Sequence, residues 1–274
     1  MVRLPFTKMH GLGNDFVVIN CLDSSCPDLK PLAKQICDRR FGIGCDQLLV
    51  ILPSERADFK MKIYNNDGGE VEMCGNGIRC VAKYLQTHGA TSKTELAIET
   101  AAGIIRPNIL GALVEVDMGE PILNAPEIPV AATGKVINHT FEIEDRPFQI
   151  TCVSMGNPHC VIFVPEVDAF PVEVWGPKIE HHPFFPKRVN VEFIEVISPT
   201  HLKMRVWERG AGETLACGTG ACAALVAAVL NGHSNREATL QLKGGDLLVR
   251  WSEKNNRVYK TGPGVEVFSG TIEL

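Results

Sequence analysis

Short apolar runs, separated by turn residues, recur along the whole chain. Many of them are rich in Val and Ile, which is the pattern of buried β-strands. We therefore expect each part of the chain to be built largely from short strands. The runs with this pattern are residues 15–21, 48–52, 59–64, 113–117, 160–164, 191–197, 202–207 and 247–251.

Two segments instead have the pattern of helices. After the sequence Cys74-Gly-Asn-Gly, apolar residues recur at helical spacing over residues 78–85, and Gly89 ends the pattern. After Cys217-Gly-Thr-Gly, residues 221–230 are apolar on every face, which predicts a buried helix. Each helix is expected to begin just after a cysteine and a Gly-x-Gly sequence.

The second half of the chain repeats the first at an offset of 143 residues. Residues 13–89 align with residues 156–232 without a gap and share 15 identities in 77 positions. Composition alone would give roughly a third of that number. A period of this length is too long for a solenoid and predicts two similar domains related by a pseudo-twofold axis. In each domain, strands would wrap around a central helix.

Composition and charge narrow the class of protein. The 274 residues are 45% hydrophobic and 22% charged, which is enough for one large or two ordinary globular domains. The net charge is -5 and no long run of Lys or Arg occurs, so nucleic acid and anionic membranes are poor partners. The longest apolar run is too short to span a bilayer. The N-terminus lacks a signal or transit pattern, so we expect a cytoplasmic location.

The ten cysteines are numerous for a chain of this kind. A disulfide framework is typical of small secreted domains, and a zinc site usually contains C-x-x-C pairs. No pair of cysteines here has that spacing. We therefore expect most of the cysteines to be small buried apolar residues, and we expect no bound metal.

Cys74 and Cys217 differ from the rest because both precede a Gly-x-Gly at a helix start. Free N–H groups at a helix N-terminus bind anions such as a carboxylate, and they should lower the pKa of a cysteine below about 8.5. A tight turn with a buried cysteine is the alternative for a single copy of the motif. Two copies at the offset of the whole repeat favour a functional pair.

The repeat predicts that these two thiols face each other across a cleft between the domains, which is a usual place for a small-molecule site. One thiolate could then remove a proton from carbon, while the other thiol returns a proton to the opposite face. The helix N-termini would stabilise charge on the substrate carboxylate. Such an inversion needs no cofactor.

The two halves also differ at positions close to these motifs. Asn65 and Asn66 align with Glu208 and Arg209. This asymmetry suits a ligand with a charged far end, although a solvated surface ion pair is the alternative. Two further aligned pairs differ, namely Gln47 with Asn190 and Phe16 with His159. For His159, a satisfied core or surface histidine stays the alternative to a functional role.

With these motifs assembled, the chain resembles the diaminopimelate epimerases from Lys8 to about Gly264. The resemblance implies an α/β fold of the α+β type with two pseudo-symmetric domains, each a mostly antiparallel barrel around a central helix. It implies conversion of LL-2,6-diaminopimelate to the meso form, for lysine and peptidoglycan precursors, without pyridoxal phosphate or metal. The segments that carry it are HGLGNDFVVI, GCDQLL, NNDGGEVEMCGNGIRC, ETAAG, GNPHCVIF and ERGAGETLACGTGACA.

The resemblance also implies roles for particular residues. Cys74 and Cys217 would be the two bases, and His159 and Glu208 would assist proton transfer beside them. Arg209 would bind the distal carboxylate of the substrate. The reacting carboxylate would be held by backbone N–H groups of Gly75, Asn76, Gly218 and Thr219. Other substrate contacts would come from Asn14, Gln47, Asn65, Asn157, Asn190 and Glu208.

The remaining expectations concern assembly and alternatives. Phe268 stands where the family often has a dimer-contact tyrosine, so a homodimer is expected. We expect an N-terminal domain of residues 1–118 and 263–274, and a C-terminal domain of residues 119–262. Two other functions stay open. One is another cofactor-free racemase, of the proline or hydroxyproline type, whose substrate would have no distal carboxylate for Arg209. The other is a thiol redox or metal-binding protein.

Overall fold

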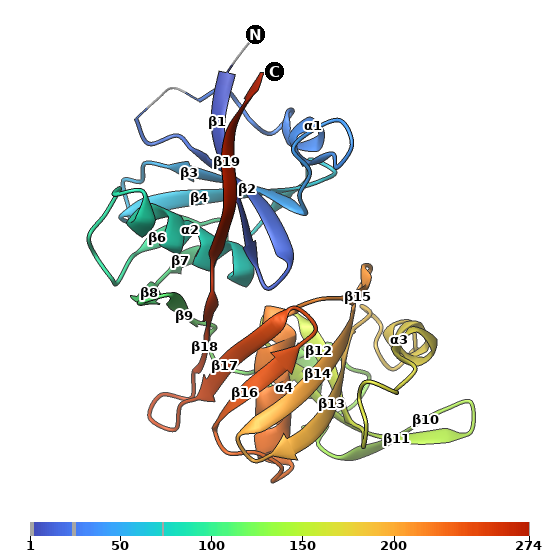
Figure 1. The fold of residues 1–274 in the computed structure, drawn as a ribbon. Coiled ribbons are helices and arrows are strands. Elements are labelled where there is room, and N and C mark those ends of the chain that lie inside the picture. The colour runs from blue at the N-terminus through green and yellow to red at the C-terminus, as the bar shows by residue number, and fades with distance from the viewer. Residues whose placement is uncertain (1–2, 24–25, 73, 274) are drawn as a thin grey trace. The chain divides into compact units, whose positions relative to one another are not determined.

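The computed structural model describes residues 3–23, 26–72 and 74–273. It contains two compact units, Met1–Val116 with Gly262–Leu274, and Asp117–Thr261. Strands outnumber helices in each unit, and among the described residues each unit has one long α-helix and one shorter one (Figure 1). The predicted fold class, two sheet-rich domains with few helices, is confirmed. The domain boundaries expected at 118/119 and 262/263 stay a prediction.

The first unit is built on a mixed sheet that packs against helix α2 (Gly75–Thr87). This helix contacts β1, β2, β3, β8 and β19, so it lies within the curve of the strands. A shorter helix, α1 (Ala33–Cys37), packs on β3 and β4. The strand order is β19 (Val265–Glu273), β1 (Arg3–Gly11), β2 (Asn14–Asn20), β3 (Gln47–Leu52), β4 (Phe59–Asn65), β6 (Ile98–Thr100) and β7 (Gly103–Ile105). Strand β5 (Glu70–Val71) pairs with β4, and β8 (Pro107–Leu110) forms a hairpin with β9 (Leu113–Asp117).

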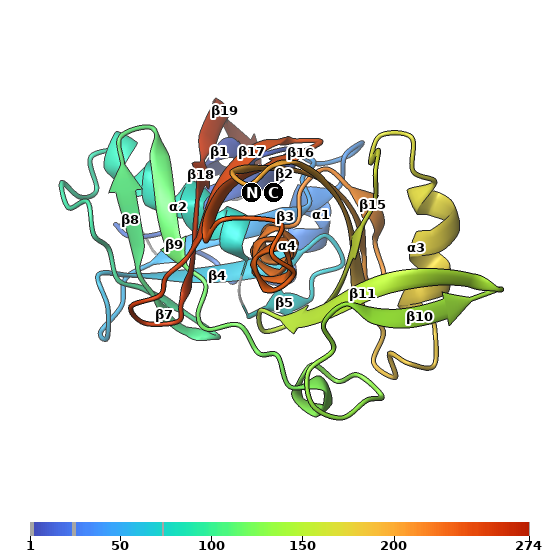
Figure 2. The same ribbon diagram turned by 90° about the horizontal axis from the view of Figure 1, so that it is seen from below.

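The second unit has the same plan around helix α4 (Gly218–Leu230). Figure 2 looks nearly along this helix and shows the strands curving around it. Helix α3 (Val172–Glu180) packs on the outside, against β13 and β14, and a short 3-10 turn covers Ala125–Glu127. The strand order is β10 (His139–Ile143), β11 (Arg146–Ser154), β12 (Pro158–Phe163), β13 (Asn190–Ser198), β14 (His201–Glu208), β16 (Glu237–Leu242), β17 (Gly245–Trp251) and β18 (Val258–Pro263), with β15 (Gly212–Thr214) beside β14.

The duplication predicted from the sequence is confirmed in the strand pairing. In the first unit β2 runs parallel to β3, and β3 runs antiparallel to β4. In the second unit β12, β13 and β14 repeat this arrangement. The register agrees to the residue, because Ile51 lies opposite Met61 and Ile194 lies opposite Met204. The offset of 143 residues therefore relates equivalent positions of two similar folds.

The eight expected strands and both long helices are present, with their ends within about three residues of the predicted ones. The helix starts need a correction, because each helix begins directly after its cysteine and the Gly-x-Gly forms the first turn. An extended cysteine can cap the helix with its sulfur, which satisfies an N–H of the first turn. The pattern did not predict β1, β10, β11 or β19, whose polar and apolar positions are mixed.

Most of the cysteines are buried apolar residues, as expected. Apart from Cys21 and Cys26, seven of the eight cysteines are buried and Cys74 is partly buried. A disulfide between Cys21 and Cys26 was not predicted. No helix in the described part of the chain is long and apolar enough to cross a membrane.

An ion-pair network ties β1 and β2 to the loop after α1. The Asp15 carboxylate accepts hydrogen bonds from Lys8 at 2.5 Å and from both terminal nitrogens of Arg39. Arg39 also bonds Asp46 at 2.7 Å. Burial alone would raise the pKa of Asp15, but the bonds from Arg39 and Lys8 outweigh it and hold the pKa below its ordinary value of 3.8.

We expect Asp15→Asn to lower the free energy of unfolding at pH 7 by about 2 kcal/mol, because charge-assisted hydrogen bonds are lost. The folded-state pKa of Asp15 lies below the unfolded one. Its contribution is therefore present above pH 3.8 and declines as the pH falls below that value. Urea unfolding at pH 7 and in acid measures both effects. Exposed Asp246→Asn serves as control, and equal stability of Asp15→Asn and wild type at pH 7 would contradict the prediction.

Candidate active site

In the first unit, strand topology gathers candidate residues at one end of the sheet. Strands β2 and β3 are parallel and begin at Asn14 and Gln47, whereas the antiparallel β4 ends at Asn65. Parallel strands start at the same edge, and an antiparallel neighbour ends there. The Gln47 amide donates to Asn65 Oδ1 at 2.9 Å, which fixes both side chains.

The second unit gathers the equivalent residues in the same way. Asn157 and His159 lie at the start of β12, Asn190 at the start of β13, and Glu208 at the end of β14. His159 is opposite Asn190 in the parallel pairing. The aligned positions of the first unit hold three side-chain amides and the Phe16 ring. The second unit therefore has more ionisable side chains at equivalent places.

Cys74 caps helix α2 and lies beside two asparagines. Its sulfur accepts the N–H of Gly77 at 3.4 Å, and its thiol points to Asn14 Oδ1 at 3.8 Å. The Asn76 amide donates to the same oxygen at 3.2 Å. Asp46 accepts from the Asn14 Nδ2 group at 2.9 Å, which turns the Asn14 oxygen toward the thiol. Cys74, Asn14 and Asn76 therefore form one small polar site.

Cys217 caps helix α4 in the equivalent way. Its sulfur accepts the N–H of Gly220 at 3.4 Å and lies 3.5 Å from the Thr219 hydroxyl oxygen. The Glu208 carboxyl accepts a hydrogen bond from the Thr214 hydroxyl and lies close enough to Cys217 for each group to shift the pKa of the other. Burial raises the pKa of Glu208 above 4.5, although the Thr214 and Cys217 side chains act in the opposite direction. Cys217 and Glu208 thus share one buried environment.

The expected lowering of the cysteine pKa is wrong for Cys217. Burial raises its pKa well above 9, and the charges of Glu208 and Glu192 raise it further. The N–H of Gly220 and the Thr219 hydroxyl do lower it, as the helix start predicts, but they are outweighed. A helix terminus contributes about 1 kcal/mol, whereas burial of a charge costs several, so desolvation decides the direction.

His159 is fully buried and has a partner at each ring nitrogen. Its Nε2 atom lies 3.0 Å from Asn157 Oδ1, which brings together two of the predicted site residues. Its Nδ1 atom lies 2.7 Å from the Glu192 carboxylate. Glu192 was not predicted from the sequence. A signal was present, because this acid interrupts an apolar strand where the first half has Leu49.

The segment that carries Glu208 and Arg209 is held by two buried side chains. Asn190 accepts the Arg209 N–H at 2.9 Å. Glu180, at the end of α3, accepts from Trp207 Nε1 at 2.7 Å and from the Gly210 N–H at 2.9 Å. Glu180 could not be predicted from the sequence, because its partners are far from it in the chain. The Arg209 side chain is exposed and able to meet a ligand.

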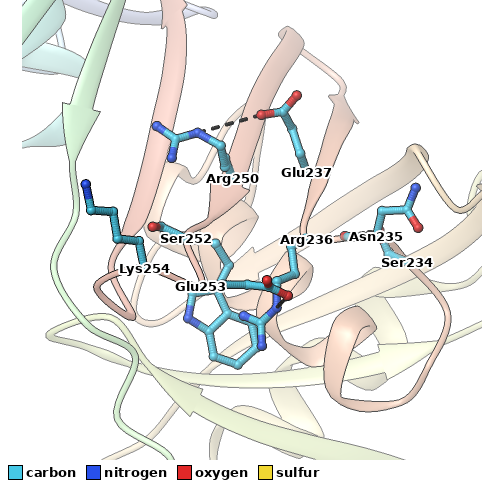
Figure 3. A pocket seen from close by; sticks show the side chains of 9 residues that line it. Ser234, Asn235, Arg236, Glu237, Arg250, Ser252, Glu253 and Lys254 are labelled. Atoms are coloured by element: carbon cyan, nitrogen blue, oxygen red, sulfur yellow. Dashed lines mark hydrogen bonds and ion pairs between the residues drawn. The ribbon is translucent and has the colours of Figure 1, made fainter.

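A separate surface pocket lies in the second unit, at the start of β16 and the end of β17 (Figure 3). None of the candidate site residues lines it. Arg250 pairs with Glu237, and Arg236 pairs with Glu253 while stacking over Trp251 at 4.3 Å. These charges already have partners within the pocket, so it offers little that would recognise a ligand.

Comparison with known proteins decides the family. The family model described as diaminopimelate epimerase matches residues 6–124 and 151–267. The chain belongs to this family. The diaminopimelate epimerase of Acetivibrio thermocellus is 57% identical over 99% of both chains. That of Moorella thermoacetica is 55% identical over 99% of this chain and 100% of its own.

Solved structures of lower identity share the fold of this family. A phenazine biosynthesis protein of the PhzF family from Bacillus anthracis superposes with a TM-score of 0.74 at 17% identity, over 100% of both chains. A hydroxyproline epimerase from Agrobacterium vitis gives a TM-score of 0.68 at 16% identity, over 98% of this chain and 92% of its own. The two-domain α+β architecture is therefore shared beyond the diaminopimelate epimerases.

Gly220 and Gly77 offer a paired test of the packing at the two helix starts. A Cβ at Gly220 would lie 2.6 Å from the Glu192 carboxylate, whereas one at Gly77 would lie 3.2 Å from a Leu49 methyl group. Replacing Gly by Ala within a helix stabilises the helix by up to about 1 kcal/mol. At Gly77 this gain partly offsets the cost of a close contact with the Leu49 methyl group.

We expect Gly220→Ala to lower the free energy of unfolding by about 2 kcal/mol more than Gly77→Ala, because the buried Glu192 oxygen must leave His159. Denaturant unfolding of both variants measures the difference. Equal losses, or a larger loss for Gly77→Ala, would contradict the described position of Glu192.

Proposed function

We propose that Cys74 and Cys217 invert one α-carbon of 2,6-diaminopimelate, interconverting the LL and meso forms without a cofactor. One observation carries the proposal. In a member of the diaminopimelate epimerase family, each of two equivalent helices starts with a cysteine whose sulfur caps the first turn. The relatives' names supply the substrate, and the duplicated thiols supply a proton acceptor and a proton donor.

The proposed reaction requires one thiolate and one thiol on opposite faces of the same carbon. The thiolate removes the α-proton and the thiol protonates the other face, so the two sulfurs exchange roles in each turnover. Burial raises the pKa of Cys217, which favours the thiol there and fits the role of proton donor in the first turnover. Charge that develops on the substrate carboxylate would be held by helix N–H groups at Gly75, Asn76, Gly218 and Thr219.

The remaining candidate residues would bind and orient the substrate. Arg209 is exposed and its guanidinium matches a carboxylate in shape, so we assign it to the distal carboxylate. Glu208 and His159 would assist proton transfer at Cys217. The polar side chains of Asn14, Gln47, Asn65, Asn157 and Asn190 would complete the site.

We further propose a cytoplasmic homodimer. The proposed reaction needs reduced thiols, which the cytoplasm maintains. For the dimer, support comes from the edge strand β19, which exposes Val265, Val267 and Phe268. Phe6, Phe41 and Phe268 line one pocket beside this edge. Exposed apolar edge strands are common sites of pairing between chains.

The reaction itself is tested by isotope exchange. We expect reduced protein in D₂O, without added cofactor, to convert LL-diaminopimelate to the meso form with deuterium at the α-carbon. Cys74→Ala and Cys217→Ala should each lose epimerisation by at least about 1000-fold, because an acid and a base are both needed. Mass spectrometry and chiral separation measure the products. Exchange with proline or hydroxyproline, but not with diaminopimelate, would favour the racemase alternative.

Arg209→Ala should raise the KM for diaminopimelate by about 10- to 100-fold, because a charge-assisted hydrogen-bonded pair is lost. Steady-state kinetics checks this, with Arg250→Ala as a control in the separate surface pocket. Thermal unfolding of both variants should match the wild type. An unchanged KM in Arg209→Ala would remove its assignment to the distal carboxylate.

Phe268→Glu should convert the proposed dimer to monomer, because a charge would replace a half-exposed ring at the centre of the apolar edge. Light scattering after size-exclusion chromatography gives the mass of each species. Val174→Glu, a similarly exposed apolar position on α3, is the control and should leave the mass unchanged. A wild-type monomer at micromolar concentration would contradict the proposal.

A further inference from the structure

The turn that carries Arg209 is held from behind by a buried acid. Glu180, the last residue of helix α3, exposes only 3% of its side chain. Its Oε1 atom accepts the Gly210 N–H at 2.9 Å, and its Oε2 atom accepts the Trp207 indole N–H at 2.7 Å. Both partners are N–H groups, so the carboxyl group accepts both bonds. The two bonds lie on either side of Glu208 and Arg209 in the chain.

Arg209 lies in the turn between β14 and β15. The Ala211 N–H donates to the Glu208 carbonyl at 3.1 Å, and Gly210 has a φ angle of 78°. A positive φ at this position is characteristic of a type II turn, which usually has Gly there. Type I and type II turns differ in the direction of the central peptide group, whose N–H here belongs to Gly210. The bond to Glu180 therefore fixes that direction, and with it the backbone of Arg209.

The other peptide group beside Arg209 is fixed as well. Its N–H donates to Asn190 Oδ1 at 2.9 Å, and the Asn190 Nδ2 group donates to the Pro158 carbonyl at 2.8 Å. A backbone N–H only donates and a carbonyl only accepts, so these partners decide which amide atom of Asn190 is the oxygen. Both peptide groups that flank Arg209 are thus bonded to buried side chains. An arginine on such a backbone loses less conformational entropy when it pairs with a ligand.

Helix α3 packs closely enough to keep Glu180 in place. A Cβ at Gly176, one turn before Glu180, would lie 2.4 Å from Trp207 Cγ, so the helix backbone lies directly against the indole. Trp207 is therefore held by packing along its ring and by the hydrogen bond at its nitrogen. The position of Glu180 relative to the turn is set by this rigid contact between a helix and a strand.

The duplication shows that this arrangement belongs to one half of the protein. The alignment of the two halves places Cys37 opposite Glu180 and Asp67 opposite Gly210. The half of the chain that has the acid behind the turn is also the half that has Arg209. A device for holding this turn is thus found where the proposed function needs a precisely placed cation.

We infer that Glu180 is a positioning residue that sets the direction of Arg209 for the distal carboxylate of the substrate. Glu208 depends on it less, because Glu208 pairs with Gly212 in the ladder of β14 and β15 and accepts a bond from Thr214. Loss of Glu180 should therefore weaken substrate binding more than turnover. The kinetic part of this inference rests on the proposed function, whereas the state of the turn can be measured without substrate.

Hydrogen exchange at Gly210 tests the structural part. Arg209-Gly210 is the only Arg-Gly sequence in the chain, so labelling with ¹³C-arginine and ¹⁵N-glycine gives this amide one identifiable NMR signal. In Glu180→Gln a single oxygen must serve two N–H groups, so we expect the Gly210 amide to exchange at least about fivefold faster than in the wild type. Glu173→Gln, at an exposed position on the same helix, should match the wild type. An unchanged Gly210 rate in Glu180→Gln would overturn the inference.

Steady-state kinetics tests the role in binding. We expect Glu180→Gln to raise the KM for diaminopimelate about 10-fold with kcat changed less than about threefold, because Arg209 loses its fixed direction. Adding Trp207→Phe should lower this KM again, because the glutamine oxygen can then accept from Gly210 alone. In an Arg209→Ala background, Glu180→Gln should raise KM less than about twofold, since the residue that it positions is gone.

The opposite results are equally clear. An equal rise in KM with and without Arg209, or a fall in kcat at unchanged KM, would overturn the positioning role of Glu180. If the wild type does not epimerise diaminopimelate, the proposed function fails, while the exchange rate of Gly210 still decides whether Glu180 holds the turn.

Discussion

The way each central helix begins constrains the rest of this structure. Cys74 and Cys217 occupy the cap position, and their sulfurs take an N–H from the first turn at 3.4 Å. The third residue of each turn must be small, because a side chain at Gly77 or Gly220 would meet the group packed behind it. The Gly-x-Gly therefore keeps backbone N–H groups accessible beside the sulfur. Cap, anion site and thiol are consequences of one local geometry.

Duplication gives the protein two copies of that geometry, and divergence makes them different. Strand register is kept to the residue, so equivalent positions on β3 and β13 point to equivalent places. One of those positions holds Leu49 and the other Glu192. In the first copy the thiol points to Asn14, whose amide in turn donates to the ionisable Asp46. In the second copy, the charges of two acids, Glu208 and Glu192, raise the pKa of the thiol.

Much of the fold could be predicted from the sequence, because the strand patterns are local and the duplication repeats them. Runs of Val and Ile identified the central strands, and the offset of 143 residues identified the equivalent pairs before any register was known. Strand β19 was missed because it lies at the sheet edge, where most of its residues are exposed and the apolar pattern is broken. Strand β1 lies inside the sheet, between β19 and β2, and was missed because Thr7, Lys8 and His10 interrupt its apolar residues. Glu180 was missed for another reason, since its role depends on Trp207 and Gly210, which only folding brings near.

The predicted direction of the pKa shift of Cys217 was wrong because of burial. Sequence identifies the helix start, and hence the favourable N–H groups, but it does not show how completely the sulfur is buried or which charges surround it. Desolvation grows with burial and acts on every ionised group, whereas the helix terminus acts over one turn. A prediction based on the motif alone therefore keeps the smaller effect and omits the larger one.

The groups around Cys217 also bear on the proposed inversion by two thiols. Burial and the Glu192 charge both raise the pKa of Glu208 and Cys217, which favours the protonated form of each group. A site that retains its protons in this way is suited to donate one. In the proposed reaction, this difference between the two halves would set the starting roles of acid and base, which an exact duplication could not do.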